Sequence, residues 1–308
     1  MAEEMYALSR LEAAFDRTKD LLWPFRWGVW LRLAVIALFL GGGASLPNIP
    51  QSYGGDDLSP GVAWSPELAL LIVALVIVAL ALAVLWMFIG STMQFVFVDM
   101  LRTGEIRLGR FFRERLGKGV RLFIFQFALT LLLVLAVFAL VVMLIGVDGS
   151  AATPFLLLAL IPAFLVVALL FGIVFLLTTD FVVPIMIRED CGVIEGWRRL
   201  IGVISANFWQ TAVYIVVKFV LGLIAAIVQA ILVILALLVI AIPFILVGIV
   251  FLAALQANIL LLLALVVPYL VIAIPVALLI AVPFVTFFRY YGLLVLAGLA
   301  PEYHLLPE

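Results

Sequence analysis

Long apolar runs alternate with short polar stretches along the whole 308-residue chain. A helix needs about 20 apolar residues to cross the hydrocarbon layer of a membrane, which is roughly 30 Å thick. Six runs meet this requirement, and we predict a transmembrane helix in each of them: 27–46, 67–98, 120–146, 155–183, 208–242 and 258–288. The pattern therefore predicts an all-α, polytopic membrane bundle of six transmembrane helices.

The last third of the chain leaves two topologies open. The stretch 208–288 holds a single charged residue, and it could form two long helices or three shorter ones broken at Pro243 and Pro268. We prefer two helices joined by an apolar, re-entrant or kinked end at 243–258, because a tight turn in hydrocarbon would leave backbone groups unpaired. This choice also keeps Arg289 on the same side as the other cations. Six spans are preferred, with seven as the alternative.

Three amphipathic segments precede pairs of spans, at 1–22, 103–118 and 188–204. The first carries an apolar stripe at helical spacing, made of Leu8, Leu11, Phe15, Thr18 and Leu22. Such a helix can lie in the plane of the membrane surface with its apolar face in the lipid. We expect three interfacial helices on the cytoplasmic side. They form either a threefold repeat of helix plus hairpin or the basic linkers of any hairpin protein.

Positive charges fall on one side of the predicted bundle. All Lys and Arg residues except Lys218 precede or begin the first span, lie between or flank spans two and three, lie between spans four and five, or follow span six, whereas 47–66 and 147–154 contain none. Since cytoplasmic loops carry an excess of these residues, we predict a cell-membrane protein with both termini, including the tail 289–308, in the cytoplasm. The first 22 residues carry five acidic side chains and no apolar core, so we do not expect a signal peptide.

Composition agrees with a single membrane domain. Only 11% of the residues are charged and 68% are hydrophobic, with a mean hydropathy of +1.41. Soluble domains have about a quarter of their residues charged. No polar stretch is long enough to fold as a separate aqueous domain, so we treat 1–308 as one integral membrane domain.

Lys218 is the only ionisable side chain deep inside a predicted span, where a charge is costly. Other residues share its helix face or lie beside it: Tyr214, Gly222, Ala226, Gln229 and Ala230. Small residues at this spacing let helices approach closely, so we expect Lys218 to face another helix. The small-residue stripe of the last span is the preferred partner, with Ala273, Ala277 and Ala281.

Two interpretations of Lys218 compete. It could form a substrate or ion site inside the bundle, or it could be a structural lysine that snorkels or pairs with an acid near the span ends. Asp180 and Asp99 are the available acids. The candidate intramembrane polar site is therefore Lys218, Asp180, Asp99, Tyr214 and Gln229.

The basic linker 102–121 has seven cations against two acids. Cations at a membrane surface attract anionic headgroups by about 1 kcal/mol each. We expect lipid contacts at five of them, Arg107, Arg110, Arg113, Arg115 and Lys118. The alternative is that these charges only set the orientation of the chain.

Many enzyme classes are excluded because the sequence lacks the residues that their chemistry needs. The only histidine is His304, and the only cysteine is Cys191. They cannot supply a zinc or haem site from the usual ligands or a histidine-dependent catalytic site. No phosphate-binding loop or dinucleotide motif is present. We expect no enzymatic activity, no cofactor and no metal.

Two segments carry a resemblance, DFVVPIMIREDCGVIEGWRRL at 180–200 and PFVTFFRYYGLLVLAG at 283–298. They resemble uncharacterised archaeal multi-pass membrane proteins and, more distantly, the membrane domain attached to some bacterial glycerophosphodiester phosphodiesterases. In these relatives a span ends near a proline and continues through an acidic residue into an amphipathic helix. Pro184, Glu189, Gly192 and Arg199 fill that pattern. The resemblance brings no catalytic residue and implies a six-span membrane domain.

These observations lead to three hypotheses about function. The first is a non-enzymatic membrane protein that binds lipid headgroups or organises partners, which would be membrane lipids, a second copy or another membrane protein, and not nucleic acid. The alternative is a small-solute or lipid transporter with a site near Lys218. The third, an enzyme acting through Asp180, Glu189 and Asp190, lacks a nucleophile or metal motif.

Overall fold

The computed structural model describes residues 6–41, 66–105, 107–145, 153–250 and 259–307. Within these ranges the chain is helical and contains no strand. The elements are α1 (Tyr6–Ser9), α2 (Leu11–Leu22), α3 (Trp27–Phe39), α4 (Pro66–Thr103), α5 (Leu108–Ile145), α6 (Thr153–Leu177), η1 (Thr178–Val182), α7 (Val183–Arg188), α8 (Val193–Ala206), α9 (Phe208–Val250), α11 (Ile259–Leu299) and η2 (Pro301–Tyr303). The expected all-α class is confirmed for these residues.

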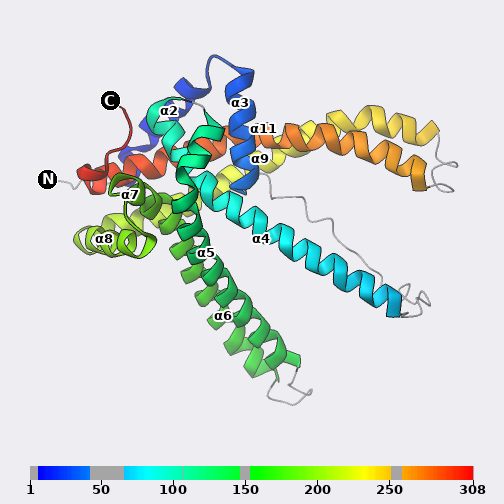
Figure 1. The fold of residues 1–308 in the computed structure, drawn as a ribbon, viewed down its shortest axis with the longest axis horizontal. Coiled ribbons are helices and arrows are strands. Elements are labelled where there is room, and N and C mark those ends of the chain that lie inside the picture. The colour runs from blue at the N-terminus through cyan, green and yellow to red at the C-terminus, as the bar shows by residue number, and fades with distance from the viewer. Residues whose placement is uncertain (1–5, 42–65, 106, 146–152, 251–258, 308) are drawn as a thin grey trace.

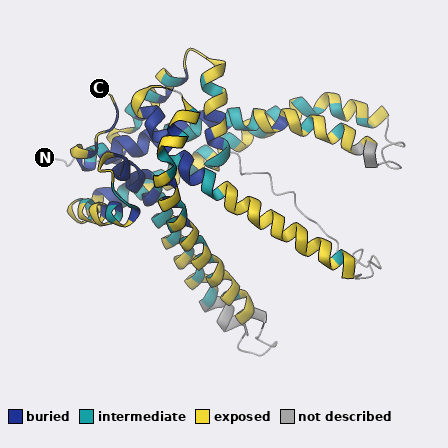
Figure 2. Ribbon diagram, in the orientation of Figure 1, coloured by how far each residue is buried: buried dark blue, intermediate teal, exposed yellow. Residues whose placement is uncertain are grey.

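Long helices project from a hub that also holds α1 and η2, the first and last described elements of the chain (Figure 1). One arm is the hairpin of α9 and α11, another is the pair α5 and α6, and the first half of α4 forms a third arm by itself. Buried residues gather in the hub, while the arms are exposed along most of their length (Figure 2). Because the exposed arm residues are large and apolar, lipid is the solvent that suits them.

Five described helices are long and apolar enough to cross a membrane: Pro66–Thr103, Leu108–Met143, Leu160–Arg188, Phe208–Val250 and Leu263–Leu299. The expected first span, 27–46, contains the shorter apolar helix α3 of 13 residues. At about 1.5 Å per residue α3 is roughly 20 Å long, which is less than the hydrocarbon thickness. Residues 42–46 lie outside the described ranges, so the described residues do not confirm a sixth span.

The stretch 208–288 forms two helices in its described part, α9 and α11. The re-entrant end expected at 243–258 is absent from 243–250, because α9 continues through Pro243 to Val250, and 251–258 lie outside the described residues. The segment 289–308, expected as a tail, begins as helix, because α11 continues to Leu299. Apolar residues dominate this extension, and they pack in the hub.

The packing of α9 on α11 matches the partner that the small-residue stripes predicted. Ala273 and Ala281 are buried, but Ala226 and Ala230 on α9 are exposed. Residues four apart advance by about 400° around a helix with 3.6 residues per turn, so a stripe with this spacing rotates away from its partner. Ala225 and Gln229 are half-buried in its place.

The three amphipathic segments differ from one another. The segment expected at 188–204 is a separate helix, α8. The segment 103–118 is not a separate helix, because α5 already begins at Leu108 and continues without a break into the apolar span. In α2, Thr18 and Leu22 are buried in the hub, whereas Phe15 is 62% exposed and does not belong to the packed stripe.

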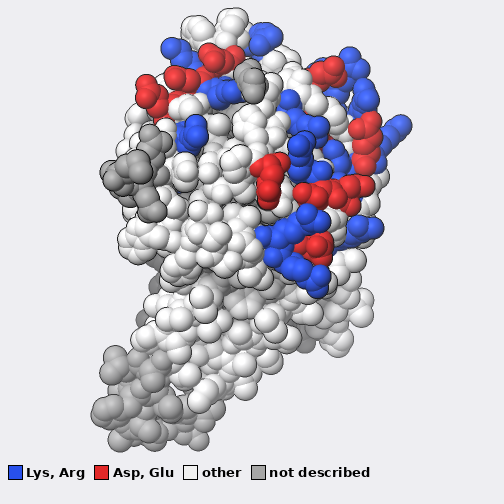
Figure 3. Space-filling model, turned by 90° about the vertical axis from the view of Figure 1, so that its left-hand side faces the viewer, with Lys and Arg blue, Asp and Glu red and all other residues white. Residues whose placement is uncertain are grey.

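Charged side chains collect on the hub side of the molecule, away from the arms (Figure 3). Many of them pair with each other at the surface, such as Arg110 with Glu114 at 2.9 Å and Arg199 with Glu189 at 3.1 Å. This separation of charged hub and apolar arms agrees with a membrane protein.

The contact between α4 and α5 depends on a glycine, and we predict a sharp difference between two neighbouring glycines. A Cβ at Gly119 would lie 2.9 Å from Cβ and 3.0 Å from Cα of buried Thr92, whereas a Cβ at Gly117 would meet nothing within 4 Å. Gly119→Ala should destabilise the protein by about 1–3 kcal/mol through overpacking. Gly117→Ala should be neutral or stabilising by up to about 1 kcal/mol. Thermal unfolding in detergent, followed by tryptophan fluorescence, measures both variants, and equal effects would contradict the close contact.

Candidate functional site

A single π turn interrupts the helical run from α6 to α7. At η1, the N–H of Val183 donates to the carbonyl of Thr178, five residues back, instead of to Thr179. The carbonyl of Thr179 is therefore left open to another donor. Pro184 follows directly and has no N–H to offer the preceding turn. The resemblance implied that the span ends near Pro184, but the helical run does not stop there, because α7 continues to Arg188.

Asp180 lies in this π turn and is the centre of a buried polar cluster. Its Oδ2 accepts a hydrogen bond from the hydroxyl of Tyr214 at 2.8 Å and forms an ion pair with Nζ of Lys218. The side chains of Asp180 and Lys218 are only 6% and 16% exposed. Because both side chains are buried, each charge is stabilised mainly by the other and not by solvation in water.

Aromatic packing fixes the position of this cluster. The ring of Tyr214 is fully buried and stacks on Phe181 with 4.8 Å between ring centroids. The ring of Tyr291 on α11 also packs against Tyr214, with 5.4 Å between ring centroids. Gly292 lets α11 approach, since a Cβ there would come within 3.2 Å of the Tyr214 hydroxyl and 3.3 Å of Cβ of Asp180.

Arg289 belongs to the same region, although the sequence did not indicate it. It is only 4% exposed. Its Nη1 donates to the open carbonyl of Thr179 at 2.6 Å, and its Nη2 donates to the backbone and side-chain oxygens of Gln94. Arg289 was expected just after the last span, and only the extension of α11 through the hub carries it inside.

These polar groups face a cavity of about 300 Å³ where α3, α4, η1, α9 and α11 meet. Its lining is Leu40, Gly41, Gln94, Phe97, Thr179, Asp180, Lys218, Val285, Phe288 and Arg289. The lining contains two cations and one carboxylate. We call this space the charged cavity.

Two of the predicted site residues lie elsewhere. Asp99 is buried against Arg115, with 2.5 Å and 3.1 Å between their nitrogen and oxygen atoms, so it joins α4 to α5 and does not pair with Lys218. Gln229 lies 11 residues beyond Lys218, about 16 Å along α9. The structure therefore brings together Lys218, Asp180 and Tyr214 only.

The five cations expected to bind headgroups do not form one surface. Arg115 turns inward to Asp99, and Lys118 donates to the carbonyl of Met186 at 2.8 Å and pairs with Asp190 at 2.6 Å. The ammonium group of Lys118 lowers the pKa of the Asp190 carboxyl. Both cations serve helix packing, because long basic side chains near the ends of apolar helices can reach carbonyl and carboxylate oxygens.

The other three expected cations are exposed. Arg107 lies 3.4 Å from Glu105, Arg110 pairs with Glu114, and Arg113 is exposed on α5. The acids of the hypothetical enzyme site also form ion pairs with different cations, because Glu189 pairs with Arg199 and Asp190 pairs with Lys118.

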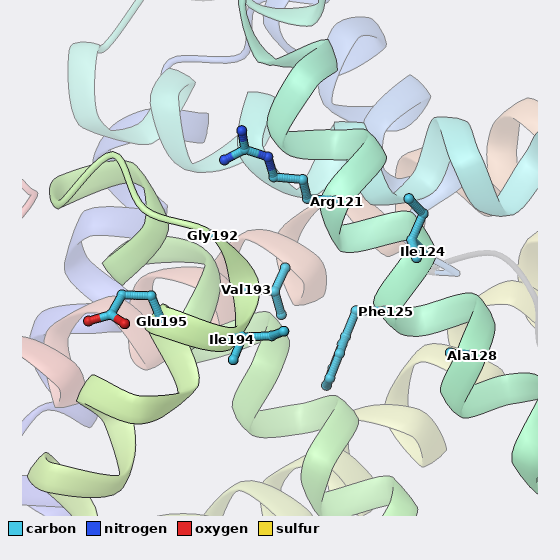
Figure 4. A pocket seen from close by; sticks show the side chains of 8 residues that line it. All are labelled: Arg121, Ile124, Phe125, Ala128, Gly192, Val193, Ile194 and Glu195. Carbon is cyan, nitrogen blue, oxygen red and sulfur yellow. The ribbon is translucent and has the colours of Figure 1, made fainter.

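A second hollow of about 670 Å³ lies between α5 and the start of α8 (Figure 4). Phe125 and Ile194 approach each other from the two helices, and Arg121 lies at one end. The remaining lining residues are Ile124, Ala128, Gly192, Val193 and Glu195. We call this hollow the α5–α8 groove.

Within the described ranges, the fold and the buried cluster define an all-helical protein with five helices able to span a membrane. The chain belongs to a family of unknown function, DUF7544, whose model matches residues 5–306. Comparison with curated proteins and with solved structures gave no match. The expectation of an uncharacterised membrane family is met at this level, and the more distant likeness to glycerophosphodiester phosphodiesterase membrane domains has no support among these findings.

The Asp180–Lys218 pair gives a prediction about stability. Lys218→Met leaves a buried carboxylate without its cation, and breaking such a pair costs about 3–5 kcal/mol. The double variant Asp180→Asn with Lys218→Met removes both charges and should recover most of this loss. Unfolding of both variants and of the wild type in detergent, at one pH, measures the difference. A double variant as unstable as Lys218→Met would show that the loss of stability in Lys218→Met does not come from the unpaired carboxylate.

Proposed function

We propose that this protein is a non-enzymatic membrane protein that binds a small solute or a lipid group in the charged cavity and moves it across the membrane. The observation that carries the proposal is the cavity itself, in which Lys218, Asp180 and Arg289 meet among otherwise apolar helices. Charges inside a membrane bundle are costly, and those that occur commonly mark substrate or ion pathways.

The position of the cavity supports this proposal. It lies at a π turn, and such turns inside α-helices are frequent at functional sites. It also lies where helices from three separate arms come together in the hub (Figure 1). A change in the angle between arms would change the shape of the cavity and its access, which is what a transport cycle needs.

Sequence composition supports the absence of catalysis in this proposal. One histidine in the tail and one cysteine leave the hub without the usual nucleophile and base pairs. For orientation, we propose that the charged hub and both termini face the cytoplasm of the cell, because nearly all Lys and Arg residues belong to that side. The proposed partners are membrane lipids and a second copy or another membrane protein.

The proposal predicts that filling the cavity abolishes ligand binding. Val285→Trp places a large side chain in the lining without removing a charge. Val271→Trp, on the same helix but 65% exposed, is the matched control. The measurement is the thermal stability of purified protein against a panel of organic acids, amino acids, amines and sugars, followed by uptake of stabilising compounds into vesicles.

The expected result is a stabilising compound that acts on the wild type and on Val271→Trp but not on Val285→Trp. A ligand at 100 times its Kd stabilises by about 2.7 kcal/mol, so the shift is measurable. If no compound in the panel stabilises the wild type or enters vesicles through it, the proposed function is wrong. A compound that acts equally on Val285→Trp binds outside the cavity.

A second candidate function is the binding of anionic lipid in the α5–α8 groove. The groove favours it because apolar side chains of both helices line its length and the exposed guanidinium of Arg121 lies at its end. An acyl chain would lie along Ile124, Phe125 and Ile194, with the phosphate at Arg121. This is the arrangement of a basic site for a lipid headgroup.

This second candidate predicts that Arg121→Gln reduces the amount of phosphatidylglycerol that stays bound during purification, because the headgroup loses its cation. Arg102→Gln, an exposed arginine at the end of α4, is the control and should have no effect. Native mass spectrometry of protein taken from mixed phosphatidylglycerol and phosphatidylcholine bilayers counts the bound lipids. Equal retention by wild type and Arg121→Gln would remove the groove from consideration.

A further inference from the structure

The charges that line the charged cavity do not balance. Lys218 and Asp180 neutralise each other through their ion pair. Arg289 has no such partner, since its hydrogen bonds go to the carbonyl of Thr179 and to the backbone and amide oxygens of Gln94, all of which are neutral. Among the described residues, no carboxylate lies within ion-pair distance of Arg289.

This imbalance is costly because Arg289 is buried. A buried charge without a counter-charge is unfavourable by several kcal/mol even after relaxation. An arginine cannot escape this cost by losing its proton, because its guanidinium stays charged in proteins. The ring of Phe97, with its centroid 5.7 Å from the guanidinium carbon, adds a cation–π attraction that offsets only part of this cost.

One donor of Arg289 also has no acceptor. Its Nε is buried and has no hydrogen-bond partner, while Nη1 and Nη2 are held by Thr179 and Gln94. The fixed Nη groups hold the guanidinium in one orientation, and Arg289 lines the cavity. A guanidinium presents a planar set of donors that suits the oxygens of a carboxylate or a phosphate.

We infer that the ligand of the charged cavity carries a negatively charged oxygen group, a carboxylate or a phosphate, which binds at Arg289 and neutralises its charge. This inference rests on the proposed function and names the chemical class of the ligand. The cavity volume of about 300 Å³ is that of about ten water molecules at roughly 30 Å³ each, which is enough for a small acid or for the phosphate of a headgroup.

The cavity also predicts how neighbouring charges change the affinity. Arg289→Gln removes the unpaired cation, so anion affinity should fall by about tenfold or more, as expected when one member of a buried charge pair is lost. Asp180→Asn acts in the opposite direction, because it releases Lys218 from its ion pair and adds a second available cation. Anion affinity should then rise several-fold. Arg102→Gln, which removes an exposed cation that does not line the cavity, should leave affinity unchanged.

The experiment measures the thermal stability of the purified full chain in a neutral detergent while sodium phosphate or sodium acetate replaces sodium chloride at constant ionic strength. A separate arm places the protein in nanodiscs of phosphatidylcholine alone or with phosphatidylglycerol. Stabilisation by phosphate or acetate indicates a free small anion as the ligand. Stabilisation by phosphatidylglycerol alone indicates a lipid headgroup, and it must depend on Arg289 and not on Arg121.

The inference stands if an anion stabilises the wild type and Asp180→Asn strengthens the effect. The increase in Asp180→Asn keeps the test valid even if Arg289→Gln fails to fold, because a merely damaged structure would not bind an anion more tightly. The inference is overturned if neither anions nor phosphatidylglycerol stabilise the wild type, or if the response is the same in Arg289→Gln.

Failure of this inference and failure of the proposed function give different results. One possible result is that an amine or an uncharged solute stabilises the wild type, that Val285→Trp removes this stabilisation, and that no anion has an effect. The cavity then binds a ligand, but the anion assignment is wrong. If no compound of any charge acts on the wild type, then both the ligand-binding function and the anion assignment are wrong.

Discussion

The hydrogen bond from Arg289 to the carbonyl of Thr179 joins two segments that lie 110 residues apart in the chain. The π turn opens that carbonyl, and the extension of α11 through the hub brings the guanidinium to it. The same guanidinium also binds Gln94, 195 residues earlier in the sequence. One buried cation thus ties α4, η1 and α11 together, and the charged cavity exists because these three elements meet around it.

The surrounding packing follows from the need to hold this cluster in an apolar bundle. Tyr214 stacks on Phe181 and packs against Tyr291, and Gly292 gives the space for its hydroxyl to reach Asp180. The hub therefore supplies the fixed geometry, whereas the arms are exposed along most of their length and carry almost no charge. In a membrane, the arms would take their stability from lipid and the hub from its own contacts.

Basic residues in the hub have two different roles. Arg115 and Lys118 pair with acids or carbonyls and hold α5 to α4 and α7, while Arg110 and Arg113 on the same helix stay exposed. Basic residues of the same type on one helix thus differ in role according to the helix face on which they lie. A count of cations in a linker does not distinguish structural pairs from surface charges.

The sequence by itself determined the helical class, the approximate positions of the five long apolar helices among the described residues, and the unusual position of Lys218 on the face of α9 that packs on α11. These properties depend on local composition and on spacing along one helix, so they can be read without knowing the neighbours. Tertiary structure alone decided that Lys218 pairs with Asp180 and not with Asp99, and that α5 absorbs the segment expected as a separate helix. It alone also placed Arg289 inside the hub. These outcomes depend on where helices end and on which residues from distant segments reach the same depth, and a pattern along the chain does not contain that information.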